Sequence, residues 1–198
     1  MVDTKLKPSL QDVTLSLMEY LQNTGMAESY LVVPAAGLSS GSVTGYWDQL
    51  SKADTLKYRF SDKVEPTAGW ASAYSQATPN FYFVVDVSTA TIVAEFALCN
   101  FMGKAAQVHF SMSPFQDSKL SIFLAEEVTN MILNNWKDVE NLEKSYIDTL
   151  FGMTPVANRV ACIFIRKAGF KAIGTLISGA TYLGETTDAL LTTKSRMI

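Results

Sequence analysis

The 198-residue chain carries 16 Lys+Arg against 19 Asp+Glu, a net charge of −3. It lacks the cationic footprint that nucleic-acid binding needs, so we expect no nucleic acid among its partners. Hydrophobic residues make up 48% and charged residues 18%, a balance typical of a globular domain. No apolar run reaches the roughly 20 residues of a membrane span, and "MVDTKLKPSLQD" lacks the apolar core of a signal peptide. We therefore expect a cytoplasmic protein.

The two cysteines and the single histidine offer little chemistry. Cys99 and Cys162 each lie in an apolar run, which favours two buried thiols in a reducing compartment. With one histidine, His109, and two distant cysteines, we expect no metal site. No G-x-S-x-G segment accompanies His109, so a Ser–His–Asp triad is disfavoured. We expect His109 to be a structural or a surface residue.

In the first half of the chain, hydrophobic spacing and turn residues predict two helices followed by a β-rich block. The expected elements are a helix at 9–24, a strand at 29–38, a helix at 39–53, an irregular stretch at 61–79, and strands at 80–88, 91–101 and 105–113. The last three strands are joined by short links, which predict an antiparallel meander.

The second half alternates helices and strands. A helix is expected at 118–136, with a buried stripe of Leu124, Val128, Met131 and Leu133. A strand follows at 146–154, and then a helix that Thr154 caps, Pro155 opens and Gly169 ends. Strands at 170–178 and 188–196 close the chain. The strand–helix–strand passage predicts a parallel crossover. The fold class is therefore α/β (α+β), a mixed, mostly antiparallel sheet with helices on both faces.

The order of elements and the segment "NRVACIFIRKAGF" (158–170) together resemble the GNAT (Gcn5-related N-acetyltransferase) fold. The family's late helix commonly has the pattern N-x-x-A-x-x-x-Y-x-K-x-G-F. The matching residues here are Asn158, Ala161, Lys167, Gly169 and Phe170. Ile165 stands where many members have a tyrosine that protonates the departing thiolate. The resemblance implies a GNAT-like domain at 29–198, preceded by an N-terminal helical extension at 1–28.

In this family, acyl-CoA lies in a V-shaped opening between the fourth and fifth strands. Its pyrophosphate is held by N–H groups of the following helix, at a signature R/Q-x-x-G-x-G/A. The matching stretch "QDSKLS" keeps Gln116 but has Lys119 and Ser121 in place of the glycines. If acetyl-CoA binds, the resemblance implies contacts from Gln116, Ser118, Lys119, Ser121 and Asn158. Alternatively, the two serines only start the helix and Lys119 is solvated.

The resemblance also suggests where a general base would lie. In this family it is usually a carboxylate in the central meander, and Glu95 is the acidic residue within the third strand. Glu95 is thus the candidate catalytic residue, unless it points to solvent from a half-exposed sheet.

Two functions follow from these matches and departures. The changes at Lys119, Ser121 and Ile165 favour a non-catalytic GNAT-fold protein that needs no cofactor and acts through protein–protein contacts. A narrower resemblance to GNAT-like proteins of tailed bacteriophages implies a virion, assembly or ejection component, present in the host cytoplasm and the virion. Its partners would be phage structural proteins or other copies of itself. The alternative is an acyl-CoA-dependent N-acetyltransferase of an unknown amine, so enzymatic activity stays open.

Overall fold

The computed structural model describes residues 29–60, 65–135, 137–138, 141–145 and 147–196. The helix predicted at 9–24, and with it the extension at 1–28, lies outside the described residues. The main sheet has the strand order β1-β2-β3-β4-β7-β9-β8. Its strands are β1 Tyr30–Pro34, β2 Phe81–Asp86, β3 Thr91–Met102, β4 Ala105–Met112, β7 Thr149–Pro155, β8 Lys171–Tyr182 and β9 Glu185–Ser195. A separate small hairpin pairs β5 Lys137–Asp138 with β6 Asn141–Ser145.

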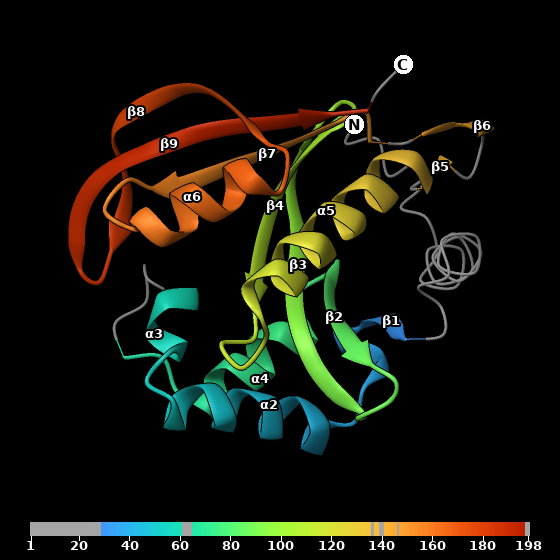
Figure 1. Cartoon of the computed structure of the whole chain (residues 1–198), viewed down its shortest axis with the longest axis vertical. Coiled ribbons are helices and arrows are strands. Elements are labelled where there is room, and N and C mark those ends of the chain that lie inside the picture. Colours follow the sequence, from blue (N-terminus) through green and yellow to red (C-terminus); the bar gives the residue numbers. More distant parts are fainter. Residues whose placement is uncertain (1–28, 61–64, 136, 139–140, 146, 197–198) are drawn as a thin grey trace, which may run out of the picture.

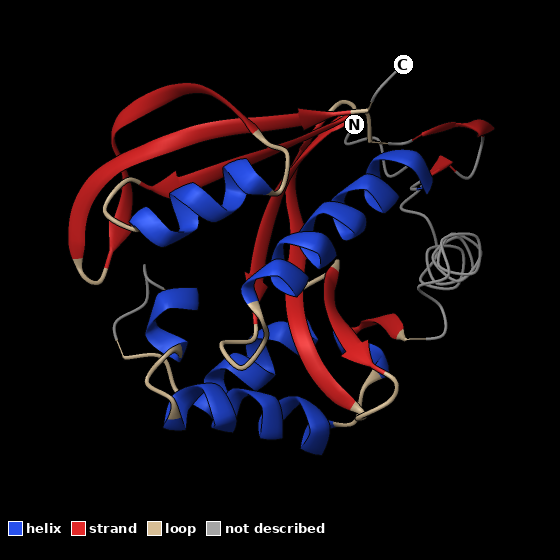
Figure 2. Cartoon of the chain, viewed as in Figure 1, coloured by secondary structure: helices blue, strands red, loops and turns tan. Residues whose placement is uncertain are grey.

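Each neighbouring pair in the main sheet is antiparallel except β4 and β7, which run parallel. This arrangement confirms the mixed, mostly antiparallel sheet and the parallel crossover predicted from the sequence (Figure 2). The helices are α2 Ser40–Lys52, α3 Leu56–Arg59, α4 Ala68–Ala77, α5 Ser118–Asn135 and α6 Arg159–Lys167, with a 3-10 turn, η2, at Ala35–Gly37. No helix in the described part of the chain is long and apolar enough to cross a membrane.

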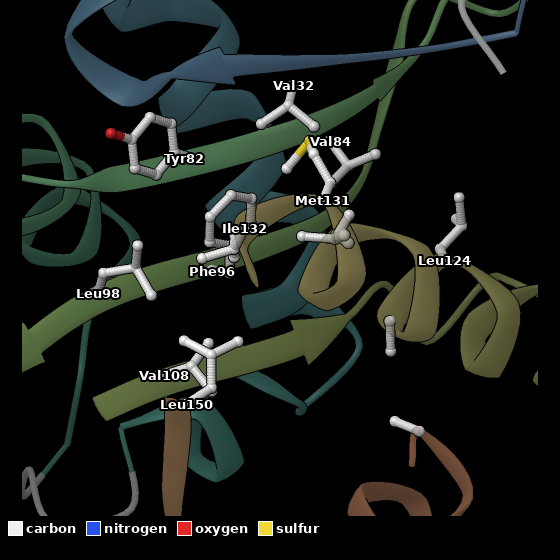
Figure 3. Packing of buried hydrophobic residues seen from close by; sticks show 14 of the residues in the cluster. Val32, Tyr82, Val84, Phe96, Leu98, Val108, Leu124, Met131, Ile132 and Leu150 are labelled. Atoms are coloured by element: carbon white, nitrogen blue, oxygen red, sulfur yellow. The ribbon is translucent and has the colours of Figure 1, made fainter. Parts of the chain in front are cut away.

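Two hydrophobic clusters lie on opposite faces of the sheet, because side chains alternate along each strand. On β2, Tyr82 and Val84 belong to the cluster under α5, whereas Phe81 and Phe83 belong to the cluster under α2 and α4. Figure 1 shows α5 and α6 in front of the strands and α2–α4 below them. The predicted stripe of α5 is buried, and Figure 3 shows Leu124 and Met131 of that helix among the side chains of this core. Helices on both faces are thus confirmed.

Helix ends follow local sequence rules where a cap is present. Ser39 precedes α2 and its hydroxyl accepts a hydrogen bond from the N–H of Ser42. After α6, Gly169 has a φ of +89°, and the N–H of Phe170 reaches back to the carbonyl of Ile165. Glycine adopts this left-handed conformation without a steric penalty, so the predicted end of the helix at Gly169 is confirmed.

Three sequence predictions were wrong. Within the stretch predicted to be irregular, 61–79, the described residues 65–79 contain a helix, because α4 occupies Ala68–Ala77 behind a Thr67 cap. The last helix does not begin at Thr154 and Pro155, since these residues end β7 and pair with β9; Asn158 caps α6 instead. The two cysteines are half-buried rather than buried. For α4 and for the end of β7, a neighbouring helix or strand decided the outcome over local preference.

Candidate functional site

The parallel strands β4 and β7 pair over a short length and then separate. Their register runs from Ala105↔Thr149 to Gln107↔Phe151 and stops there, although β4 continues to Met112 and β7 to Pro155. Figure 1 shows the two strands leaving a common end and diverging. Beyond the last pair, β4 remains paired with β3 and β7 with β9. Alternate backbone N–H and C=O groups along the separated edges therefore lack a strand partner.

Aromatic rings flank the separation on the α5/α6 face. Phe110 of β4 stacks with Phe164 of α6 at 6.2 Å between ring centroids. Phe110 also stacks on Phe96, and Phe96 on Tyr82, so the rings continue across β3 and β2. Ile165, at the position of the family's tyrosine, packs against the same core. The walls on this face are therefore apolar, and Ile165 brings no proton donor to them.

The opposite face of β4 carries polar side chains. His109 and Ser111 alternate with Val108 and Phe110, and His109 is exposed. Ser111 lies opposite Glu95 of β3. At the margin of this face, Tyr58 of α3 stacks on Tyr182 at the β8–β9 hairpin, with 6.5 Å between ring centroids. The separated strands thus have an apolar side and a polar side.

Glu95 is buried rather than pointing to solvent, and protein donors already occupy its carboxylate. Its Oε1 accepts a hydrogen bond from Nε of Arg59 at 3.1 Å, and its Oε2 accepts one from the Tyr46 hydroxyl. Burial raises the pKa of Glu95, while Arg59 and the hydrogen bonds from Tyr46, Arg59 and Ser111 act in the lowering direction. The pKa of Tyr46 is likewise raised well above its usual value, first by burial and then by Glu95.

Arg59 connects three elements around Glu95. Besides the ion pair with β3, Nη1 donates to the carbonyl of Thr55 at 3.3 Å, and Nη2 donates to the carbonyl of Met112 at the end of β4. Arg59 therefore links α3 to β3 through the ion pair and, through its hydrogen bond to Met112, to β4, the strand that separates from β7. Sequence inspection missed Arg59, which is 36 positions from Glu95, and no local pattern could have identified it.

The residues predicted to bind acyl-CoA lie near the start of α5 and α6, and the side chains of two of them make structural hydrogen bonds. The hydroxyl of Ser121 is directed back to the carbonyl of Asp117 at 2.9 Å. Asn158 caps α6, its Oδ1 accepting from the N–H of Ala161 at 3.1 Å. Ser118 and Lys119 are exposed, and Gln116 is half-buried. Contact of these five residues with acyl-CoA stays a prediction.

Asp117, which the sequence predictions omitted, caps α5. Its Oδ1 accepts from the N–H of Lys119 at 2.8 Å and from the N–H of Leu120 at 3.3 Å. The signal was present in the sequence, since aspartate directly before a helix is a preferred N-cap. No group of three or more His, Cys, Asp or Glu able to hold a metal ion occurs among the described residues.

The sequence matches no protein-family model and no curated protein. Solved structures of GNAT acetyltransferases do match the fold. A GNAT-family acetyltransferase from Bacillus anthracis has a TM-score of 0.65 at 12% identity, covering 84% of this chain and 95% of that one. The microcin C7 self-immunity acetyltransferase, solved with acetyl-CoA and AMP, has a TM-score of 0.64 at 11% identity, covering 84% and 92%.

A third similar structure is spermidine N-acetyltransferase from Vibrio cholerae, solved with CoA and spermine. It has a TM-score of 0.59 at 16% identity, covering 85% of this chain and 96% of that one. The chain therefore has the GNAT fold over nearly the whole length of these proteins, as the sequence resemblance implied. The narrower likeness to phage proteins finds no support in these comparisons.

Proposed function

We propose that the chain is an N-acyltransferase that takes an acyl group from a thioester, with acetyl-CoA as the first donor to test, and transfers it to an amine. The observation that carries this proposal is the separation of β4 and β7 beyond Gln107 and Phe151. The acetyltransferases that share the fold support it, since structures of two of them contain acetyl-CoA or CoA.

The separated strand edges suit the arm of such a donor. Backbone groups without a strand partner bind best to another extended chain of amides, and the pantetheine arm of CoA is one. Phe110 and Phe164 supply apolar contact beside it. In the transfer, the amine nitrogen forms a bond to the acyl carbon and the carbon–sulfur bond breaks. The nitrogen loses a proton, and the sulfur leaves as a thiolate that solvent protonates, because Ile165 has no proton to give.

We assign the proton acceptor to His109 rather than Glu95. His109 is exposed on the polar face of β4, and histidine is the side chain that most often acts as a general base. Both oxygens of Glu95 are already bound by Tyr46 and Arg59. Glu95 then acts as a positioning residue that holds Arg59 and, through it, the end of β4.

The test is thiol release from acetyl-CoA in the presence of a panel of primary amines, together with calorimetry of acetyl-CoA binding. We expect His109→Gln to lower kcat/KM by about 100-fold, because the amine then lacks its proton acceptor. The acetyl-CoA Kd should stay unchanged, because His109 acts on the amine. An unaltered rate in His109→Gln would contradict its role. No binding of acetyl-CoA at millimolar concentration would contradict the proposed donor.

A second candidate function is a non-catalytic role through protein–protein contacts, within a phage particle or its assembly. The protein-contact role, though not the phage setting, is favoured by apolar side chains that are exposed on α6, on the turn before it and on β8, because exposed apolar surface can mark an interaction site. These are Val156, Val160, Ile163, Ile173, Leu176 and Ile177.

Sedimentation of the full chain and of Ile177→Lys tests this second candidate for self-association. We expect an oligomer that the substitution dissociates, since Ile177 is 81% exposed in the single chain. A wild-type monomer at every concentration would contradict self-association through this surface.

A further inference from the structure

The first turn of α5 already holds an anion supplied by the chain itself. The carboxylate of Asp117 accepts the N–H groups of Lys119 and Leu120 through one oxygen, at 2.8 and 3.3 Å. These are N–H groups that an 18-residue helix leaves without an intrahelical partner. A carboxylate at this end is also favoured by the helix dipole. Two N–H groups at the helix start therefore have an acceptor without any ligand.

This arrangement does not fit the diphosphate that the GNAT resemblance would place at the helix start. A phosphate oxygen would have to displace the Asp117 carboxylate from the same N–H groups, and the two negative charges would repel each other at close range. Lys119 and Ser121 stand where glycines would let the backbone approach a phosphate. Ser121 cannot compensate easily, because it is buried and its hydroxyl is directed to the carbonyl of Asp117.

The place we assign to the thioester arm is the separation of the two parallel strands. β4 and β7 separate beyond Gln107 and Phe151, with their outer edges still paired. Phe115 and Lys119 are exposed to solvent, Met153 of β7 is half-buried, and Phe110 stacks on Phe164 beside the separation. The chain thus keeps the features that would receive an acylated amide arm, while the features that would receive a nucleotide diphosphate are replaced.

We propose that the acyl donor is a thioester on a pantetheine arm, recognised through the arm and the acyl group and not through a nucleotide diphosphate. This inference rests on the proposed acyltransferase function and narrows its donor. The shared chemistry is the acyl-pantetheine group. It can be free, or it can be carried through a single phosphate on a carrier protein.

Calorimetry of the full chain with three donors tests the inference: acetyl-CoA, acetyl-pantetheine and an acetylated acyl carrier protein. For the wild type we expect Kd values for acetyl-CoA and acetyl-pantetheine within about threefold of each other, since the diphosphate adds little net binding. A carrier-bound donor that binds more tightly than acetyl-pantetheine would identify the carrier protein as its source. Equal affinities for the carrier-bound donor and acetyl-pantetheine would identify the free acyl-pantetheine as the donor.

Two substitutions at Asp117 separate the effect of its negative charge from the effect of its capping hydrogen bonds to the start of α5. Asp117→Asn keeps the capping oxygen and removes the charge, whereas Asp117→Ala also frees the two N–H groups. We expect Asp117→Ala to tighten acetyl-CoA binding about tenfold while acetyl-pantetheine binding is unchanged, because charge-assisted bonds to the diphosphate then become available. Asp117→Asn should give a smaller gain, since its side chain still occupies the N–H groups.

The outcomes distinguish a failure of this inference from a failure of the proposed acyltransferase function. If the wild type binds acetyl-CoA more than about tenfold tighter than acetyl-pantetheine, the donor assignment is wrong while the acyltransferase proposal stands. The same holds if Asp117→Ala leaves the ratio of the two Kd values unchanged. If none of the three donors binds at millimolar concentration, both the inference and the proposed function fail.

Discussion

Replacing Arg59 with methionine should be strongly destabilising at neutral pH. The side chains of Arg59 and Glu95 are only 9% and 6% exposed. With an effective dielectric constant of about 20, charges 3.1 Å apart attract by roughly 5 kcal/mol. Removing the guanidinium leaves the Glu95 carboxylate buried without a counter-charge. We therefore expect Arg59→Met to lower the free energy of unfolding by about 3–5 kcal/mol, measured by urea denaturation at pH 7.

A matched control is available in an ion pair at the surface. Lys104 and Asp148 are 3.3 Å apart, but their side chains are 57% and 42% exposed. Lys104→Met should therefore cost less than about 1 kcal/mol. The double substitution Arg59→Met with Glu95→Gln should recover most of the loss, because no buried charge remains. The reasoning is refuted if Arg59→Met costs no more than Lys104→Met, or if the double variant is no more stable than Arg59→Met alone.

The loss in Arg59→Met should depend on pH in a defined direction. Burial already raises the pKa of Glu95, and Arg59 opposes that rise. Without Arg59, the pKa in the folded state rises further above the unfolded value of about 4.3, so the folded state binds a proton that the unfolded state does not. The stability of the variant should increase as the pH falls through the raised folded pKa. The deficit relative to wild type should therefore be smaller at pH 5 than at pH 7.

Substitutions at three further positions test the remaining structure by urea denaturation. The Thr192 hydroxyl is buried and has no hydrogen-bond partner in the described residues, so Thr192→Val should stabilise by about 1 kcal/mol, whereas Thr192→Ser should not. Lys194 donates to the carbonyl of Ala168 at 3.1 Å, and Lys194→Met should cost about 1–2 kcal/mol at pH 7. Burial lowers the pKa of Lys194 in the folded state. Between this lowered pKa and the unfolded pKa of about 10.4, the unfolded state binds the extra proton, so wild-type stability should rise with pH. The rise should be absent in Lys194→Met. Asn158→Ala removes the cap bond to Ala161 and should cost about 1 kcal/mol.

The candidate site was predictable where it depends on short-range sequence. The start of α5 and the end of α6 could be located because caps and glycine stops act within four residues. Asp117 was equally open to prediction, as an aspartate directly before an apolar helix. The role of Arg59 was not, because the residue lies on a short helix next to residues of ordinary composition, and only packing brings it to Glu95.

Helix α4 shows where the sequence pattern misleads. Its buried residues are small, namely Ala68, Ala71, Ser72 and Ser75, so the periodic hydrophobic signal of a helix is weak. Close packing explains the choice of residues. Thr44 of α2 bonds Ser72 at 2.9 Å, and Trp47 donates to Ser75 at 3.2 Å. Small side chains let the two helices approach, which the sequence by itself does not reveal.

The sequence by itself determined the order of the main elements, the alternation of the meander strands and the stripe of α5. These depend on residue periodicity and on caps, which are local physical constraints. Only the tertiary structure decided that β4 and β7 separate after Gln107 and Phe151, and that Arg59 holds the end of β4. These features arise from pairings between residues distant in sequence, whose free energy depends on burial and charge compensation after the chain has folded.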